Sequence, residues 1–139
     1  LAAGILELDE TDEIFYLERI RLADGEPLAH DRVWLPGELA RPLMGVDFTH
    51  TALYAELRDH CGLGPEEGQE RIKPVIHDER HANYHELAGG QPALEIERRT
   101  NSHGAPLEWR ITLVRGDRYN FRAEWNAEDT LVVPRLVAR

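Results

Sequence analysis

The chain has 139 residues, a formal net charge of −10 and a single cysteine. This length predicts one domain with a core large enough to fold without disulfides, and one cysteine excludes an internal disulfide framework and fits a reducing cytosol. The acidic balance argues against this segment binding nucleic acid by itself. The short apolar runs exclude a membrane-spanning helix, and no signal peptide is visible. Because the chain begins with Leu1, we expect it to be part of a longer protein.

The first third of the chain predicts a β-hairpin between short helical segments. Leu1 to Leu8 has apolar spacings typical of the end of a helix, and an acidic turn follows at Asp9 to Glu13. Ile14 to Pro36 then alternates in hydrophobicity on both sides of an Asp-Gly turn, which predicts two antiparallel strands. One helical turn around Glu38 to Ala40 and a loop over Val46 to His50 are expected next.

The turn of the hairpin decides which side chains share a face. A register with Glu18 opposite Asp31 would place like charges together, so we predict a three-residue turn, Ala23-Asp24-Gly25, with the glycine left-handed. This places Arg19, Arg21 and Asp31 on one face, with the two arginines about 6.6 Å apart along the strand. That spacing suits the two ends of one small anion. On periodicity alone, a solvated edge with a salt bridge is the preferred interpretation.

A helix is predicted in the middle of the chain. Thr49 or Thr51 is expected to cap it, and it should run to about Cys61. Gly62 directly follows and can adopt the left-handed conformation that ends a helix.

The second half predicts further strands around one more helix. Gln69 to His77 is expected to be a strand whose Pro74 implies a sheet edge or a bulge. A helix over Asp78 to Leu87 and a strand over Ala93 to Thr100 follow, and residues 130–139 are either a strand or a tail. Adjacent antiparallel strands with separate helices predict an α+β domain. In the strand after these, apolar side chains form one face and a more polar set points the other way: Leu107, Trp109, Ile111 and Leu113 against Glu108, Arg110, Thr112 and Val114.

Few residues suit metal or nucleophilic chemistry, and no cofactor is expected. His81 and His85 have a spacing that can bind zinc, but position 82 is alanine instead of the glutamate of a metalloprotease helix, so a solvated helical face is preferred. The single serine, Ser102, lies beside a turn glycine, and Cys61 lies at the helix end that does not lower a thiol pKa. The RGD run at Arg115 to Asp117 is interpreted as a structural corner.

Several short motifs occur in a characteristic order: R-x-R, DGEP and LP in the hairpin, then LY, PLEW and RGDRY. In this order, over roughly Ile5 to Arg122, the chain resembles the effector-binding UTRA domain, the C-terminal half of GntR-type transcription regulators of the HutC subfamily. The resemblance implies a chorismate lyase-like fold, in which helices flank a mostly antiparallel sheet. It also implies that residues 1–139 form a single effector-binding domain, and that the winged helix-turn-helix domain that contacts DNA is absent from this chain.

The resemblance also implies a ligand site. The two arginines of R-x-R would hold a phosphate, an acidic residue of the second strand would hold a polar group, and the helix at LY would offer its N-terminus. The implied ligand-binding residues are Arg19, Arg21, Asp31, Thr51, Ala52, Tyr54 and Glu108. Ala52 replaces a usual serine, and Trp34, Trp109 and Val114 depart from the family pattern. These departures argue against an amino-sugar phosphate and favour a carboxylate or another phosphorylated ligand.

The leading hypothesis is a cytoplasmic, ligand-sensing domain of a bacterial repressor. A small anionic metabolite, either a sugar phosphate or a carboxylate, would shift the DNA-binding equilibrium by a coupling of about 1–3 kcal/mol. DNA would be contacted only through the missing N-terminal domain. The domain is expected to form a two-fold homodimer whose interface covers apolar residues of Arg115 to Trp125. An enzyme of the chorismate lyase type and an interaction module without a ligand are the alternatives.

Overall fold

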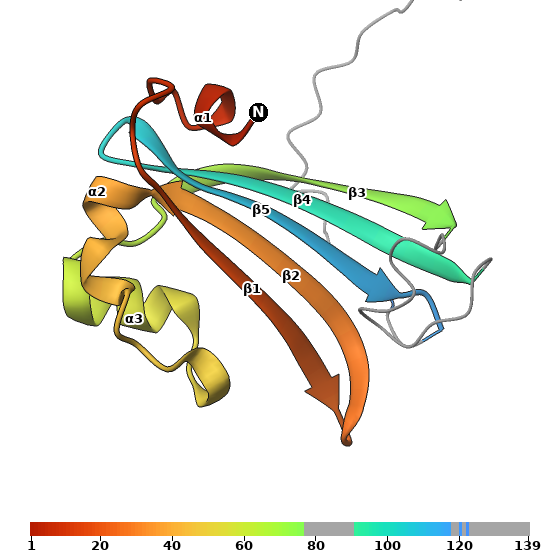
Figure 1. Ribbon diagram of the computed structural model, residues 1–139. Coiled ribbons are helices and arrows are strands. Elements are labelled where there is room, and N and C mark those ends of the chain that lie inside the picture. The colour runs from red at the N-terminus through yellow and green to blue at the C-terminus, as the bar shows by residue number, and fades with distance from the viewer. Residues whose placement is uncertain (77–90, 118–119, 121, 123–139) are drawn as a thin grey trace, which may run out of the picture.

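The computed structural model describes residues 1–76, 91–117, 120 and 122. It contains five strands in the order β1-β2-β5-β4-β3, and every neighbouring pair is antiparallel (Figure 1). This confirms the predicted α+β class with a mostly antiparallel sheet. The elements are α1 (Ala2–Ile5), β1 (Ile14–Ala23), β2 (Glu26–Pro36), α2 (Gly37–Ala40), η1 (Arg41–Leu43), η2 (Phe48–His50), α3 (Leu53–Cys61), β3 (Glu67–Ile76), β4 (Pro92–Ser102) and β5 (Ala105–Arg115), where η denotes a 3-10 helix.

The β1–β2 turn is tighter than the sequence predicted. Ala23 pairs with Glu26, so only Asp24 and Gly25 lie in the loop, and their φ angles are 52° and 79°. Two consecutive positive φ angles are typical of a type I′ turn, whose twist matches that of the flanking strands. The predicted three-residue turn is therefore wrong, because an Asp-Gly pair can supply both left-handed residues.

A bulge in β2 nevertheless restores the predicted facing of the side chains. The register shifts between Arg21 and Leu22, where Leu28 of β2 has no opposite residue. Beyond this bulge Arg19 pairs with Asp31. One extra residue changes which side chains share a face, because strand side chains alternate with a period of two. Arg19, Arg21 and Asp31 therefore do lie on one face, as the sequence predicted.

The hydrophobic core lies between the β1–β2 hairpin and the segment from α2 to α3. In Figure 1 these helices lie together beside β1 and β2, away from β3. Leu53 and Leu57 lie one turn apart on α3 and are almost fully buried, so the helix packs through one apolar face. The core cluster consists of Phe15, Val33, Leu35, Ala40, Leu43, Leu53 and Leu57.

The start of α3 differs from the prediction. Its N-cap is Ala52, which offers no side-chain hydrogen bond, while Thr51 is extended and its hydroxyl donates to Glu56 at 2.7 Å. Capping by Thr49 or Thr51 is therefore a wrong prediction: the Thr51 hydroxyl is directed to a carboxylate instead of a backbone N–H. The end of the helix is as predicted, with Gly62 in the left-handed region at φ 66°.

The segment before α3 was predicted as a loop, but Phe48–His50 forms a 3-10 turn. The carboxylate of Asp47 accepts from the backbone N–H of Thr49 at 2.9 Å, which stabilises the first residues of this turn.

β5 lies in the middle of the sheet and is buried on both faces. Trp109 and Leu113 are nearly inaccessible on its apolar face, and Glu108 and Thr112 are as well covered on the other. On the apolar face the rings of Trp34 and Trp109 stack with centroids 4.5 Å apart. The alternation in β5 was predicted correctly, and the polar face that it creates lies under the helices.

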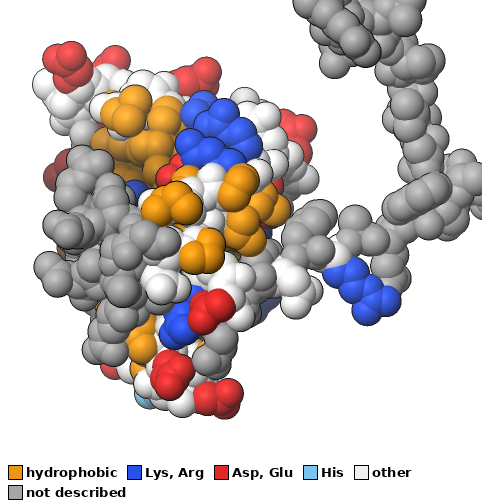
Figure 2. Space-filling view, turned by 90° about the vertical axis from the view of Figure 1, so that its right-hand side faces the viewer, with side chains coloured by type: hydrophobic (Ala, Val, Ile, Leu, Met, Phe, Trp, Pro, Cys, Tyr) orange, Lys and Arg blue, Asp and Glu red, His pale blue; other side chains and the backbone are white. Residues whose placement is uncertain are grey.

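β3 forms one edge of the sheet, which agrees with the interpretation of Pro74 as a residue of an edge strand. Figure 2 looks from the side on which β3 lies and shows hydrophobic side chains beside basic and acidic ones. Past the end of β5, the guanidinium of Arg115 pairs with Asp117 at 2.7 Å and the N–H of Gly116 donates to the Pro92 carbonyl at 3.0 Å. These contacts are those of a structural corner.

Some predictions lie outside the described residues: the helix over Asp78 to Leu87, its histidine pair, and the strand or tail over residues 130–139. Within the described ranges, no three or more histidine, cysteine or acidic side chains gather to form a metal site. None of the helices in that part of the chain has the length and apolar character needed to cross a membrane.

Candidate anion-binding site

The strand register gathers polar side chains on the sheet face that α3 covers. Residues that pair across antiparallel strands lie on the same face, so the row Arg19, Asp31 and Thr112 runs across β1, β2 and β5. A second row runs from β5 through β4 to β3. The polar face consists of Arg19, Arg21, Asp31, Glu70, Arg98, Thr100, Glu108, Arg110 and Thr112, and Tyr54 of α3 reaches it from above.

Asp31 is the acidic centre of the part formed by β1 and β2. Its side chain is 1% exposed, and its Oδ1 accepts from the Thr112 hydroxyl at 2.5 Å. Arg21 Nε lies 2.7 Å from Oδ2, but this ion pair does not have the geometry of a hydrogen bond. Oδ2 therefore retains the capacity to accept a hydrogen bond in a buried position, which suits a hydroxyl or ammonium group of a ligand.

Arg19 lies next to Asp31 and, in the part of the chain that the structure describes, forms no ion pair with a carboxylate. Its Nη1 donates to the Thr51 carbonyl at 3.1 Å, whereas its Nε is buried without a hydrogen-bond partner. Burial lowers the pKa of Arg19; the charge of Asp31 opposes this effect, and those of Arg110 and Arg21 add to it. A half-buried guanidinium with a buried Nε favours an anion, because an anion would supply both the missing acceptor and the missing charge.

Glu108 is the acidic centre of the part formed by β4 and β5. Its Oε1 accepts from the Tyr54 hydroxyl at 2.6 Å and from the Thr100 hydroxyl at 3.1 Å. Its Oε2 accepts from Nε of Arg110 at 2.7 Å, and Nη2 of Arg110 forms an ion pair with the same oxygen, also at 2.7 Å. Burial and the charge of Glu108 raise the pKa of Tyr54.

Arg98 extends this network to the edge strand. Its Nε and Nη2 lie 2.7 and 2.6 Å from the Glu70 carboxylate, and its Nη1 donates to the Tyr54 oxygen at 3.1 Å. Burial works against the charge of Arg98, yet the bonds to Tyr54 and Glu70 raise its pKa above the ordinary value. The guanidinium of Arg110 also lies 5.1 Å from the centre of the Tyr54 ring. Tyr54 thus fixes the first turn of α3 to the sheet.

A groove of about 950 Å³ opens beside Arg19 and Arg21. Its walls are residues 17–22 of β1 and residues 46–51 of the segment before α3. Since both walls are continuous runs, the groove follows the outer edge of β1. Of the predicted ligand-binding residues, Arg19, Arg21 and Thr51 line it.

The other predicted ligand-binding residues lie around this groove or beneath α3. Asp31 is adjacent to Arg19 across the strand pair, and Ala52 is exposed at the N-cap of α3. Tyr54 and Glu108 belong to the neighbouring hydrogen-bonded network.

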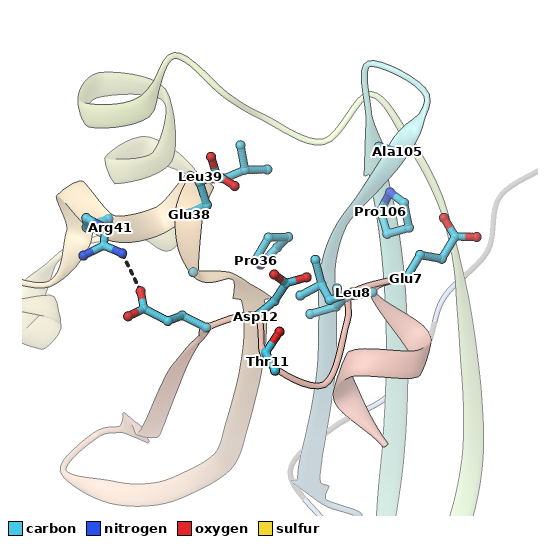
Figure 3. A pocket seen from close by; sticks show the side chains of 13 residues that line it. Glu7, Leu8, Thr11, Asp12, Pro36, Glu38, Leu39, Arg41, Ala105 and Pro106 are labelled. Carbon is cyan, nitrogen blue, oxygen red and sulfur yellow. Dashed lines mark hydrogen bonds and ion pairs between the residues drawn. The ribbon is translucent and has the colours of Figure 1, made fainter.

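A second hollow, of about 740 Å³, has the opposite electrostatic character. It lies where the segment before β1, helix α2 and the β4–β5 turn meet, and Figure 3 shows Arg41 on one side of it and Glu7 on the other. Four of its lining residues are acidic, and its arginine pairs with one of them, Glu13. This hollow is therefore unsuited to an anion.

Five further residues of the polar face were not predicted from the sequence to belong to the site: Arg98, Arg110, Thr100, Thr112 and Glu70. One signal was present, because the alternation in β5 had already placed Arg110 and Thr112 on the same face as Glu108. The pairing of β5 with β2 and β4, which carries these residues to Asp31 and Tyr54, was not readable from the sequence.

Known proteins resemble the chain over most of its length. The family model for the UTRA domain matches residues 2–120. The chain is 28% identical to the transcriptional repressor NagR of Bacillus subtilis and 26% identical to the transcriptional regulator GgaR of Escherichia coli, in each case over 86% of the chain. It spans about half the length of these relatives, 49% and 47%.

Solved structures show the same fold. The effector domain of PhnF from Mycobacterium smegmatis superposes with a TM-score of 0.82 at 27% identity, covering 90% of this chain and 77% of that one. The C-terminal domain of the histidine utilization repressor from Pseudomonas syringae has a TM-score of 0.81 at 20% identity, covering 89% of this chain and 86% of that one.

Proposed function

The chain belongs to the UTRA domain family, and from this membership we propose that it is the effector-binding part of a bacterial transcription regulator whose effector is a small anion. The relatives are named as transcriptional regulators, and the chain matches about half of their length. DNA contact then belongs to a separate helix-turn-helix part of the protein. The alternative of a chorismate lyase-type enzyme has no support among these relatives.

The proposal of an anion depends mainly on the incomplete pairing of the Arg19 guanidinium. The polar face holds the four guanidinium groups of Arg19, Arg21, Arg98 and Arg110 against three carboxylates, in a chain of net charge −10. Each of the other three arginines has an ion pair with a carboxylate. Among the described residues, Arg19 has only a backbone carbonyl, which cannot neutralise its charge.

The buried Oδ2 of Asp31 indicates a second feature of the ligand. An anion held by Arg19 would lie next to a buried oxygen that can accept one more hydrogen bond. We therefore propose a ligand with a hydroxyl or amino group close to its anionic group, such as a sugar phosphate or a hydroxycarboxylate. The N-terminal N–H groups of α3 would add to the binding of the anion. Ala52 contributes no hydroxyl, so Thr51 is the nearest side chain that can replace the usual serine.

The hydrogen bond between Arg19 and the Thr51 carbonyl suggests how an anion would change the structure. Arg19 ties β1 to Thr51, the residue before the N-cap of α3. An anion would compete with the Thr51 carbonyl for this guanidinium and so favour a different position of the 46–51 segment. Whichever arrangement binds the anion more tightly gains population, and DNA affinity shifts by the same coupling energy, typically about 1–3 kcal/mol.

We also propose that the protein is cytoplasmic and works as a two-fold homodimer. The apolar residues in the sequence from Arg115 to Trp125 motivate this interface, and residues 118, 119, 121 and 123–125 of that range lie outside the described residues. Sedimentation that gives only monomer at tens of micromolar would contradict the dimer. This chain alone should not bind duplex DNA, and tight salt-sensitive binding would contradict the assignment of DNA contact to a separate part.

A thermal-shift screen of phosphorylated sugars and hydroxycarboxylates tests the ligand proposal. A ligand that binds only the folded chain stabilises it by about 2.7 kcal/mol at a hundredfold excess over its Kd. The stabilising compounds should be anions, and Arg19→Ala and Arg21→Ala should each weaken the effect. Stabilisation that survives the loss of both arginines would place the site elsewhere.

A further inference from the structure

Glu108 is a predicted ligand-binding residue whose carboxylate is already engaged within the chain. Its side chain has no exposed surface, and its oxygens accept three hydrogen bonds, from the hydroxyls of Tyr54 and Thr100 and from Nε of Arg110. Nη2 of Arg110 forms an ion pair with Oε2 at 2.7 Å. An ionised carboxylate offers about four acceptor positions, and these four contacts surround both oxygens, which leaves little room for a ligand.

The partners of Glu108 face the anion site from two directions. Arg110 pairs across the sheet with Val33 of β2, two residues beyond Asp31 on the same face. Its positive charge is close enough to Arg19 to contribute to the lowered pKa of that residue. Tyr54 lies in the first turn of α3, the helix end that points toward the Arg19 groove.

Arg110 itself is held on both sides. Its Nε and Nη2 bind the Glu108 carboxylate, and its guanidinium lies against the ring of Tyr54, so most of its side chain is covered. A guanidinium fixed by two neighbours loses little conformational freedom when it also binds an anion.

From these contacts we infer that Glu108 is a positioning residue that holds Arg110 and α3 in place, and that Arg110, which the sequence did not assign to the site, is the third arginine facing the anion. This inference rests on the proposed anion site. It replaces a direct contact between Glu108 and the ligand by an indirect role through Arg110 and Tyr54.

Inorganic phosphate is the discriminating probe, because it has no substituent that could reach Glu108. Calorimetric titration with phosphate should show Glu108→Gln weakened about tenfold, the loss of roughly one charged hydrogen bond. The control is Glu97→Gln, a carboxylate on the opposite face of β4 that pairs with Arg99. If Glu108→Gln binds phosphate as the natural chain does, and loses affinity only for larger anions, Glu108 contacts the ligand directly and the inference is overturned.

The two partners of Glu108 give the same test if Glu108→Gln does not fold. Arg110→Gln should weaken phosphate binding about tenfold and Tyr54→Phe by a smaller factor, since of these two residues only Arg110 is inferred to contact the anion. Arg99→Gln, on the opposite face, should leave it unchanged. Equal phosphate affinity in Arg110→Gln and Arg99→Gln would overturn the role of Arg110.

A spectroscopic readout separates this inference from the proposed function. Ultraviolet titration of tyrosine should show a lower apparent pKa for Tyr54 in Glu108→Gln, because the carboxylate helps to raise it. An unchanged tyrosine titration would show that Glu108 does not hold Tyr54 and would overturn its positioning role, whatever phosphate does. If the natural chain does not bind phosphate or any other anion, the proposed site fails, and the inferred contact of Arg110 fails with it.

Discussion

The polar face of the sheet has two parts that use the same residue types in opposite ways. In the β4–β5 part, Glu108 and Arg98 each make several hydrogen bonds, and together they join α3 to the sheet. In the β1–β2 part, Arg19 Nε lacks a hydrogen-bond partner and Asp31 Oδ2 accepts no well-directed hydrogen bond. Each part is centred on a fully buried carboxylate, Asp31 in one and Glu108 in the other, so burial alone does not distinguish them.

This difference in hydrogen bonding indicates which part of the polar face binds a ligand. Buried polar groups are nearly always satisfied in native proteins, so a fully bonded network acts as scaffold and an incomplete one indicates a missing partner. An anion with a neighbouring donor would complete the β1–β2 part and could add nothing to Glu108. The β4–β5 part then keeps the unfilled groups in place while the site is empty.

The largest contrast is expected in stability. Glu108→Ala removes one partner from a buried network and leaves Arg110 and the Tyr54 hydroxyl without an acceptor. We expect the free energy of unfolding in urea to fall by about 3–5 kcal/mol. Glu97→Ala, on the opposite face, should cost about 0.5–1 kcal/mol. Equal losses for the two variants would remove the distinction between scaffold and surface.

Arg19→Met should give the reverse pattern, with lost affinity and preserved stability. The thioether side chain keeps much of the packing of the arginine and removes a charge that no carboxylate neutralises. Phosphate affinity should fall by about 1.5–3 kcal/mol, while the free energy of unfolding stays constant or rises. A variant that loses stability as severely as Glu108→Ala would mean that Arg19 belongs to the scaffold.

Two threonine-to-valine variants remove the same kind of hydrogen bond, a hydroxyl that donates to a buried carboxylate, from the two parts of the polar face. Thr112→Val leaves Oδ1 of the buried Asp31 without its donor, so we expect a loss of about 1–3 kcal/mol. Thr100→Val leaves Glu108 with its bonds to Tyr54 and Arg110, and the expected loss is about 0.5–1.5 kcal/mol. Urea unfolding of both variants measures the difference. A larger loss in Thr100→Val would contradict the assignment of Asp31 to the less satisfied part.

The smallest effect concerns alkaline pH. Burial and Glu108 raise the pKa of Tyr54 above its ordinary value of 10.0, so the folded state favours the neutral phenol. This contribution to stability is fully present below the pKa of the unfolded chain and is lost as the pH rises through the raised pKa of the folded chain. Stability measured from pH 9 upward should therefore fall less steeply in Tyr54→Phe. Identical slopes would show that the pKa of Tyr54 is not raised in the folded chain.

Local patterns predicted most of the fold. Alternation located β1, β2 and β5, Gly62 marked the end of α3, and Pro74 marked an edge strand. The predictions for the turn at Asp24 and for the N-cap of α3 were wrong. Asp24 and Gly25 supply both left-handed residues of a two-residue turn, and the Thr51 hydroxyl bonds Glu56 instead of a backbone N–H.

The site was predicted only in part, for a physical reason. Arg19, Arg21 and Asp31 belong to one hairpin, so local parity was enough to bring them together. Arg110 meets Tyr54 through strand pairing and helix docking between segments more than fifty residues apart, as the Tyr54–Glu108 hydrogen bond also shows. No local pattern encodes such a contact, and the satisfied state of Glu108 becomes visible only when all its donors are in place.

Because of the bulge at Leu28, the arrangement of the site depends on the number of residues in the hairpin. Asp31 is fixed by the pairing of β2 with β5, so losing the one extra residue would turn β1 over relative to it. Arg19 and Arg21 would then exchange faces with Ile20 and Leu22. Deletion of one residue at this bulge would thus separate the arginines from Asp31 without substituting any residue of the site.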